Sequence, residues 1–266
     1  MNWKQFLRDK SRLFKTNYSR APLYAKLVTH RITPYLVYLF AKMGLTPDQV
    51  TTLSLIVGWV SSLLFAFPSP AVVLLAALGL ETYYILDSVD GQLARLTGRC
   101  SKTGAFFDIL LNYLVHPWVF IFMGIGQYRL SGHWLWMLCG SVSALSYVWL
   151  GLMWNVRAHV LLESFFGKSL TLREEKIEGQ ERNAGGARRQ RRQWVPRQIF
   201  SLLHKVCTFP TVMNGVTIIA LFEFVTGRLD LLGYLLGFYS VAIPLVSLTK
   251  ISKMILEREP DQAYNS

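Results

Sequence analysis

The sequence predicts an all-α polytopic membrane protein with six transmembrane helices and an N-terminal amphipathic surface helix. Hydrophobic residues make up 52% of the 266 residues and charged residues only 17%, whereas roughly a quarter of an ordinary soluble domain is charged. The net charge of +12 lies in a few blocks between long apolar stretches, which is typical of membrane proteins and argues against a nucleic-acid partner. Three widely separated cysteines argue against a disulfide framework or a structural zinc site.

Three regions follow from the distribution of polar and apolar residues. Residues 1–43 are basic, and we expect surface or juxtamembrane helices there, because 3–15 mixes aromatic and leucine side chains with Lys and Arg, and 22–43 is too short in apolar length to span a bilayer. Residues 44–255 form the six-helix transmembrane domain, and 256–266 form a polar C-terminal tail.

Six apolar runs reach the length of about 20 residues that a helix needs to cross the hydrocarbon core. The expected spans are 47–67, 70–91, 104–126, 132–155, 208–227 and 230–250. With both termini cytoplasmic, every Lys and Arg except Arg129 and Arg228 falls on the inner side, as the positive-inside rule requires. The sequence therefore predicts an integral membrane protein with its termini in the cytoplasm.

The inner loop at about 156–207 ends in a basic cluster. Arg188, Arg189, Arg191 and Arg192 lie close together there. One interpretation is a solvated charge run that sets topology, and the other is a docking surface for anionic lipid headgroups.

Carboxylates at the ends of two apolar runs are the main functional signal. Asp87 and Asp90 close the second run one helical turn apart, and Asp108 and Asn112 lie one turn apart in the third, with His116 a turn further. Ionisable groups at membrane depth are costly and usually face a partner inside the bundle. We expect a hairpin through 92–103 to make these two helices antiparallel neighbours, so that their polar faces meet.

Oxygen ligands from two helices suit a hard divalent cation, Mg²⁺ or Mn²⁺, with positions left open for phosphate oxygens. Gly91, Ala94 and Gly104 allow a ligand or a backbone to approach closely. Arg95 is suited to phosphate recognition or to pairing with an Asp. The competing interpretation, in which Asp87 and Asp90 only form salt bridges at a helix end, accounts for that pair but not for Asp108 and the glycines.

The spacing of these residues resembles the signature of the CDP-alcohol phosphotransferase family, D-x2-D-G-x2-A-R-x8-G-x3-D-x3-D. The chain reads Asp87-x2-Asp90-Gly91-x2-Ala94-Arg95-x8-Gly104-x3-Asp108-x3-Asn112 and differs at the last position. The preceding stretch from Leu45 to Thr51 is also similar to the start of the family's first span. Six helices with an N-terminal surface segment match the family's usual architecture.

The resemblance implies a divalent-metal-dependent membrane transferase in phospholipid biosynthesis. Such an enzyme moves a phosphatidyl or alcohol-phosphate group from a CDP-linked donor, for which we expect CDP-diacylglycerol, to the hydroxyl of a small alcohol or lipid acceptor, with release of CMP. It further implies a homodimer with its site on the cytoplasmic side. By this resemblance the metal ligands are Asp87, Asp90 and Asp108, and the residues around the donor are Gly91, Ala94, Arg95, Ser101 and Gly104.

Asn112 stands where the family has its general base, and an amide cannot accept a proton near neutral pH. Three interpretations remain open. His116 serves as the base instead, the metal lowers the pKa of the acceptor hydroxyl enough, or the chain is an impaired relative that still binds a CDP-linked ligand. A lone histidine in a span is also often just hydrogen-bonded to a neighbouring helix. A non-enzymatic scaffold or transporter is the alternative class, although no repeat of two corresponding halves supports a transporter.

Overall fold

The computed structural model describes residues 30–175 and 205–257, and this part of the chain is entirely helical, which confirms the all-α prediction. Its helices are α2 (His30–Lys42), α3 (Pro47–Leu64), α4 (Pro70–Thr97), α5 (Lys102–Ser131), α6 (Leu135–Glu175), α8 (Phe209–Thr226) and α9 (Leu231–Glu257). The expected surface segment at 3–15 and the arginine cluster at 188–192 lie outside the described residues.

Five of the described helices are long and apolar enough to cross a membrane, and they make the chain an integral membrane protein. They are α4, α5, α8, the Leu135–Met153 part of α6 and the Leu231–Ser252 part of α9. The sixth expected span, α3, does not meet this standard. It is as long as α8, at 18 residues, but hydroxyl and other polar side chains occupy its first turns and recur at Ser61 and Ser62, so that α3 is less apolar than the five spans.

Helix ends differ from the expected ones around the acidic residues. α4 continues through the motif to Thr97 and ends at Gly98, whose φ of +69° suits a residue without a Cβ. α5 begins at Lys102, so the expected connection at 92–103 is in fact a short turn. α6 continues to Glu175, and the first part of the expected inner loop at 156–207 is therefore helical.

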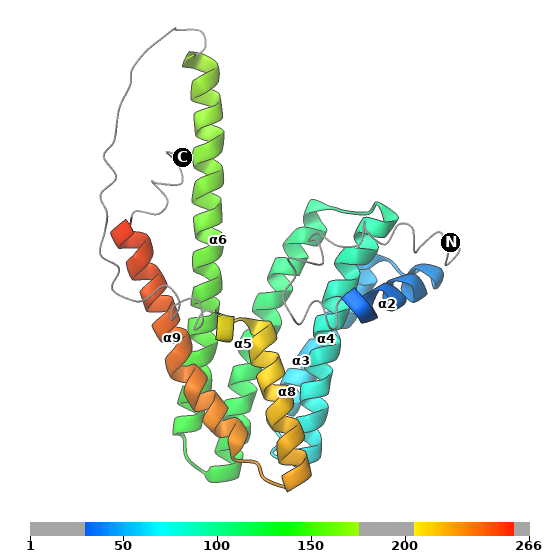
Figure 1. The fold of residues 1–266 in the computed structure, drawn as a ribbon, viewed down its shortest axis with the longest axis vertical. Helices are drawn as coiled ribbons and strands as arrows, with labels where there is room; N and C mark the ends of the chain where they lie inside the picture. The colour runs from blue at the N-terminus through cyan, green and yellow to red at the C-terminus, as the bar shows by residue number, and fades with distance from the viewer. Residues whose placement is uncertain (1–29, 176–204, 258–266) are drawn as a thin grey trace.

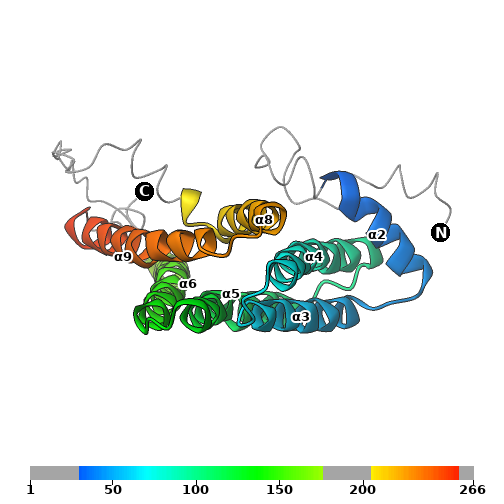
Figure 2. The ribbon, with the colours of Figure 1, turned by 90° about the horizontal axis from the view of Figure 1, so that it is seen from below.

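The six long helices of the described residues pack as two layers. Seen from below, α3, α5 and α6 form one layer, and α4, α8 and α9 form the other (Figure 2). α3 packs against both α4 and α5, while α4 and α5 themselves share few close backbone contacts. The expectation that α4 and α5 are neighbours whose polar faces meet is thus corrected in part: α3 lies against both helices, and α4 and α5 meet through side chains such as Tyr83 and His116.

Close helix crossings depend on small residues at defined places. A Cβ on Gly140 of α6 would lie 2.5 Å from the carbonyl oxygen of Phe120 on α5, and one on Gly124 would lie 2.6 Å from that of Trp136. On α3, a Cβ on Gly58 would lie 2.9 Å from side-chain atoms of both Tyr83 and Val115. Glycine therefore brings the backbones of α5 and α6 together, as small residues do in membrane bundles.

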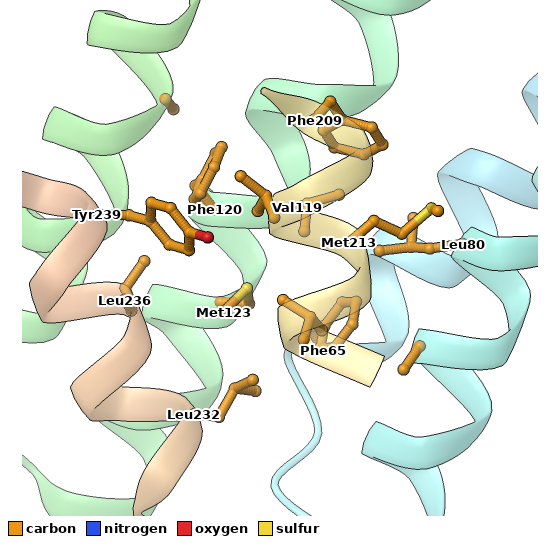
Figure 3. Close-up of a cluster of buried hydrophobic side chains, with 14 of the residues drawn as sticks. Phe65, Leu80, Val119, Phe120, Met123, Phe209, Met213, Leu232, Leu236 and Tyr239 are labelled. Carbon is orange, nitrogen blue, oxygen red and sulfur yellow. The ribbon is translucent and has the colours of Figure 1, made fainter. Parts of the chain in front are cut away.

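The main core lies between the two layers. Phe120 and Met123 of α5 pack there with residues from α8 and α9, among them Met213, Leu236 and Tyr239 (Figure 3). The buried Glu223 of α8 also belongs to this interior. Its Oε1 accepts the backbone N–H of Leu232 at 2.8 Å and so caps the start of α9.

A second, smaller core joins α2 to the end of α4 that carries the acidic motif. Val37 of α2, Val50 of α3, and Leu86, Val89 and Leu93 of α4 are its buried members. Thr33 of α2 adds a buried hydrogen bond of 2.9 Å to Gln92. α2 thus crosses α4 near its C-terminal end (Figure 1).

Side chains from the end of α5 hold the turns at the opposite end of the bundle. Gln127 donates to the carbonyl oxygen of Leu229 at 3.1 Å, and Arg129 donates to that of Ala66 at 3.0 Å. The guanidinium of Arg129 also lies 5.2 Å from the ring centre of Phe67. Both the α3–α4 turn and the α8–α9 turn are therefore fixed to α5.

Candidate functional site

Asp87 and Asp90 lie on the last three turns of α4, at the end of the bundle where α2 crosses (Figure 1). Asp90 is only 6% exposed, and its Oδ2 accepts a hydrogen bond of 2.7 Å from Thr51 Oγ1 of α3. Oδ1 of Asp87 is buried and has no hydrogen-bond partner in the described structure. Leaving a carboxylate oxygen unpaired in an apolar surrounding is costly, and so this oxygen is a suitable ligand for a cation.

Asp108 and Asn112 lie on the first turns of α5. Asp108 is exposed, and Asn112 is half-buried. The Nδ2 group of Asn112 donates to the backbone carbonyl oxygen of Asp108 at 2.8 Å. This bond turns the amide nitrogen toward its own helix and leaves the amide oxygen as the end that can meet a second molecule.

The acidic side chains share one electrostatic environment although they come from different helices. Asp90 and Asp108 each interact electrostatically with Asp87, and both also interact with Arg95. Nevertheless, no group of three or more His, Cys, Asp or Glu residues in the described part is arranged to hold a metal ion. The three carboxylates lie near one another, and α3 packs against both of the helices that carry them.

The residues expected around a donor flank the short turn between α4 and α5. The Arg95 guanidinium folds back over Gly91, since a Cβ at that position would lie 3.5 Å from Nη1. Ser101 is the N-cap of α5, and its Oγ accepts the backbone N–H of Gly104 at 2.9 Å. Ala94 is half-buried in the last turns of α4. Arg95 also interacts electrostatically with Cys100, directly before the N-cap of α5, so that a guanidinium lies near the positive end of a helix dipole, a combination suited to phosphate.

His116 lies deeper, in a packed aromatic cluster, and is 5% exposed. Its Nδ1 is 3.0 Å from the Tyr147 hydroxyl, and its Nε2 is 3.4 Å from the Tyr83 hydroxyl. The imidazole also stacks on Phe209 of α8, with ring centres 3.4 Å apart. Both ring nitrogens thus face tyrosine hydroxyls, and the side chain connects α4, α5, α6 and α8.

Two features of this region are not identified by the acidic spacing alone. Thr51 contacts Asp90 from α3, and Tyr83 and Tyr147 enclose His116. Thr51 could have been found from the sequence, since it is the last residue of the Leu45–Thr51 stretch that resembles the start of the family's first span. The sequence does not identify Tyr83 and Tyr147 as contacts of His116, because these contacts depend on how the helices pair.

Comparison with known proteins agrees with the acidic motif. Residues 44–174, slightly less than half of the chain, match a family model described as CDP-alcohol phosphatidyltransferase. This segment includes α3, α4, α5 and nearly all of α6, and therefore every acidic residue of the site. The family that the motif resembles is thus supported for this part of the chain.

Curated relatives resemble shorter stretches. The bifunctional IPC transferase and DIPP synthase of Aquifex aeolicus is 40% identical over 88 residues, which are 33% of this chain and 18% of the relative. Mouse cholinephosphotransferase 1 is 30% identical over 118 residues, 35% of this chain and 30% of the relative. The archaetidylinositol phosphate synthase of Pyrococcus horikoshii is 35% identical over 74 residues, which are 28% of this chain and 38% of the relative. The chain thus spans less than two-fifths of each relative, and all three have the names of transferases or synthases.

Proposed function

We propose that the chain is a membrane-embedded transferase that moves a phosphatidyl or alcohol-phosphate group from a CDP-linked donor to an acceptor hydroxyl, with release of CMP. The observation that carries the proposal is the set of acidic residues near the C-terminal end of α4 and the N-terminal end of α5, within the segment that matches the CDP-alcohol phosphatidyltransferase model. The names of the relatives support the same class of reaction in phospholipid synthesis.

The acidic residues fit a divalent cation chemically. All donors are carboxylate oxygens, as Mg²⁺ and Mn²⁺ prefer, and Asp87 Oδ1 is already buried without a protein partner. Asp87, Asp90 and Asp108 are the proposed ligands. A bound cation would neutralise these carboxylates and the charge on the donor's phosphates.

The remaining roles belong to the residues around the turn between α4 and α5. Arg95 and the start of α5 are proposed to hold the diphosphate of the donor, while Gly91, Ala94 and Gly104 leave room for it and Ser101 shapes the turn. In the reaction the acceptor oxygen forms a bond to phosphorus as the bond to the CMP oxygen breaks. Asn112 is proposed to orient the acceptor hydroxyl through its amide oxygen.

The proton of the acceptor hydroxyl needs a destination other than Asn112. His116 is one candidate, and accepting this proton requires Nδ1 or Nε2 to exchange its tyrosine contact for one with the acceptor. The other candidate is water, if the cation lowers the pKa of the acceptor hydroxyl sufficiently. Losing a well-placed base typically costs about 10²–10⁴ in rate, so a chain without either route binds the donor and turns it over slowly.

The proposed orientation places the site on the cytoplasmic side. At the opposite end of the described bundle, the Lys and Arg residues are Arg129 in the last turn of α5 and Arg228 in the turn after α8, in agreement with the positive-inside rule. We also propose a homodimer, by analogy with the family. α2 is proposed to lie along the inner membrane surface.

The test is CMP release by purified protein in detergent with Mg²⁺ or Mn²⁺. CDP-diacylglycerol and CDP-choline serve as donors, each with glycerol phosphate, inositol phosphate, serine or diacylglycerol as acceptor. We expect metal-dependent CMP release with one pair, and its loss in Asp108→Asn and after chelation. Donor binding without CMP release from any pair would instead show that the chain is an impaired relative, the alternative that Asn112 raises. The absence of both would support a scaffold or transporter.

A further inference from the structure

A hydrogen bond between α3 and α4 reaches the site from outside the acidic motif. The Oγ1 hydroxyl of Thr51 donates to Asp90 Oδ2 at 2.7 Å. Building on the proposed function, we propose that Thr51 is a positioning residue, which holds the Asp90 carboxylate in the orientation that binds the divalent cation. Asp90 is the ligand and Thr51 acts through it.

The start of α3 is fixed so that Thr51 meets Asp90. Thr46 and Gln49 form a reciprocal cap, in which Gln49 Oε1 accepts the N–H of Thr46 at 2.9 Å and Thr46 Oγ1 accepts that of Gln49 at 3.3 Å. Pro47 occupies the first helical position, where its missing N–H is harmless. Val50, directly before Thr51, is buried in the small core with α2 and α4. The helix therefore begins at a defined residue and against a defined surface.

The neighbouring Thr52 shows what a threonine at this place does without an acidic partner. Its Oγ1 donates to the carbonyl oxygen of Asp48, four residues earlier, at 2.9 Å, and its side chain is exposed. Thr51 has the same kind of acceptor in Pro47, at 3.0 Å, but lies closer to Asp90 Oδ2. A hydroxyl has one hydrogen, and a bond to an ionised carboxylate is roughly twice as strong as one to a neutral acceptor. Asp90 is therefore the preferred acceptor.

Fixing one carboxylate oxygen determines where the other points. The backbone N–H of Gly91 also hydrogen-bonds to the Asp90 side chain, so that contacts from two helices restrict rotation of the carboxylate. Partners of this kind orient ligands in metal sites, and their removal typically lowers metal affinity or activity by about 10–100-fold. The same loss is expected here when only the hydroxyl of Thr51 is removed.

The experiment compares Thr51→Val, which keeps the shape and loses the hydroxyl, with Thr51→Ser, which keeps the hydroxyl. Thr52→Val is the matched control on the same turn. Mn²⁺ binding to each purified full-length variant is measured from the electron paramagnetic resonance signal of free Mn²⁺, without substrate. Thermal unfolding in the absence of metal shows that each variant is folded.

We expect Mn²⁺ affinity to fall about 10–100-fold in Thr51→Val, and to stay near the wild-type value in Thr51→Ser and Thr52→Val. Equal affinity in the wild type and Thr51→Val, with binding lost in Asp87→Asn, overturns the role of Thr51 and leaves the proposed function standing. A wild type that neither binds Mn²⁺ nor releases CMP overturns both. Equal losses in Thr51→Val and Thr51→Ser assign the effect to packing and also overturn the inference.

Discussion

At the scale of single residues, the amide at position 112 is the feature that most affects the chemistry. Asn112 is fixed by its hydrogen bond to the Asp108 carbonyl oxygen. It occupies the position at which the CDP-alcohol phosphotransferase signature has an Asp that serves as the general base. An amide orients a hydroxyl but does not accept its proton. The rate of the chain therefore depends on where that proton goes.

Replacing Asn112 with Asp restores a proton acceptor at the position of the signature. We expect CMP release in the presence of Mg²⁺ or Mn²⁺ to rise by about 10²–10⁴-fold if the wild type lacks a base. The measurement is initial CMP release from the preferred donor and acceptor pair. An Asn112→Ala variant is the control for space alone. Unchanged activity in Asn112→Asp would show that the wild type already has an efficient route for the proton.

His116 offers a second test at the same scale. Its ring contacts Tyr83, Tyr147 and Phe209 from three other helices. If its role is to support the core, His116→Gln, which keeps a donor and an acceptor, retains activity, whereas His116→Ala leaves a cavity and lowers the thermal unfolding temperature. Activity and unfolding are measured on the same preparations. Loss of CMP release in His116→Gln at unchanged unfolding temperature would instead identify His116 as the base.

At the scale of helices, the crossing of α5 and α6 is set by backbone contact. The space beside Gly140 is occupied by the carbonyl oxygen of Phe120, which cannot rotate away as a flexible side chain would. Helices in a membrane associate through such close packing, because lipid provides no hydrophobic drive between them. The crossing should therefore be sensitive to a single methyl group.

Gly140→Ala is expected to destabilise the bundle by about 1–3 kcal/mol, the usual cost of overpacking. For a chain of this size that cost corresponds to a fall of several degrees in unfolding temperature. The matched control is Gly215→Ala on α8, where the nearest atom to a Cβ is the Tyr239 hydroxyl oxygen at 3.9 Å. The unfolding temperature of both variants is measured by tryptophan fluorescence during heating in detergent. Equal behaviour of the two variants would mean that α5 and α6 can separate freely.

Helix positions were largely predictable, whereas their ends and pairing were not. Apolar runs indicated each long helix, because bilayer length and composition are local properties of the chain. The extension of α6 to Glu175 was missed because polar sequence after a span is compatible with helix or loop. The placement of α3 beside α5 depends on contacts such as Gly58 with Tyr83 and Val115, which no local pattern encodes.

The site was predictable to the extent that it follows helical spacing. Asp87 and Asp90 share one end of α4, and Asp108 and Asn112 share the first turns of α5, as predicted. The bond from Thr51 to Asp90 joins residues 39 positions apart. Such a contact follows only from the pairing of α3 with α4, and the same holds for the tyrosines around His116.

At the scale of the whole molecule, the three cysteines report on orientation. Cys100 is exposed in the turn between α4 and α5, Cys139 is half-buried in α6, and Cys207 is buried just before α8. Burial raises the pKa of the Cys207 thiol to about 11, so that it remains protonated and unreactive at neutral pH. Cys100 is therefore the accessible thiol beside the site.

A membrane-impermeant maleimide should label the wild type in inside-out vesicles and much less in right-side-out vesicles, because the proposed orientation places Cys100 on the inner face. The degree of labelling is measured by gel shift, with Cys100→Ser as the control that removes the signal. Labelling from the outer side that disappears in Cys100→Ser would reverse the orientation of the bundle. It would leave the arrangement of the helices unchanged.

The docking of α2 on α4 also has a consequence for how such chains diverge. The unspecified positions inside Asp87-x2-Asp90-Gly91-x2-Ala94 include Val89, Gln92 and Leu93, all buried, and Gln92 bonds to Thr33. The motif does not specify these residues, but each of them packs against or hydrogen-bonds to α2. We therefore expect orthologues with substitutions in α2 to carry compensating substitutions at these positions of α4. Paired substitutions between residues 33–37 and 89–93 are the evolutionary trace that this contact should leave.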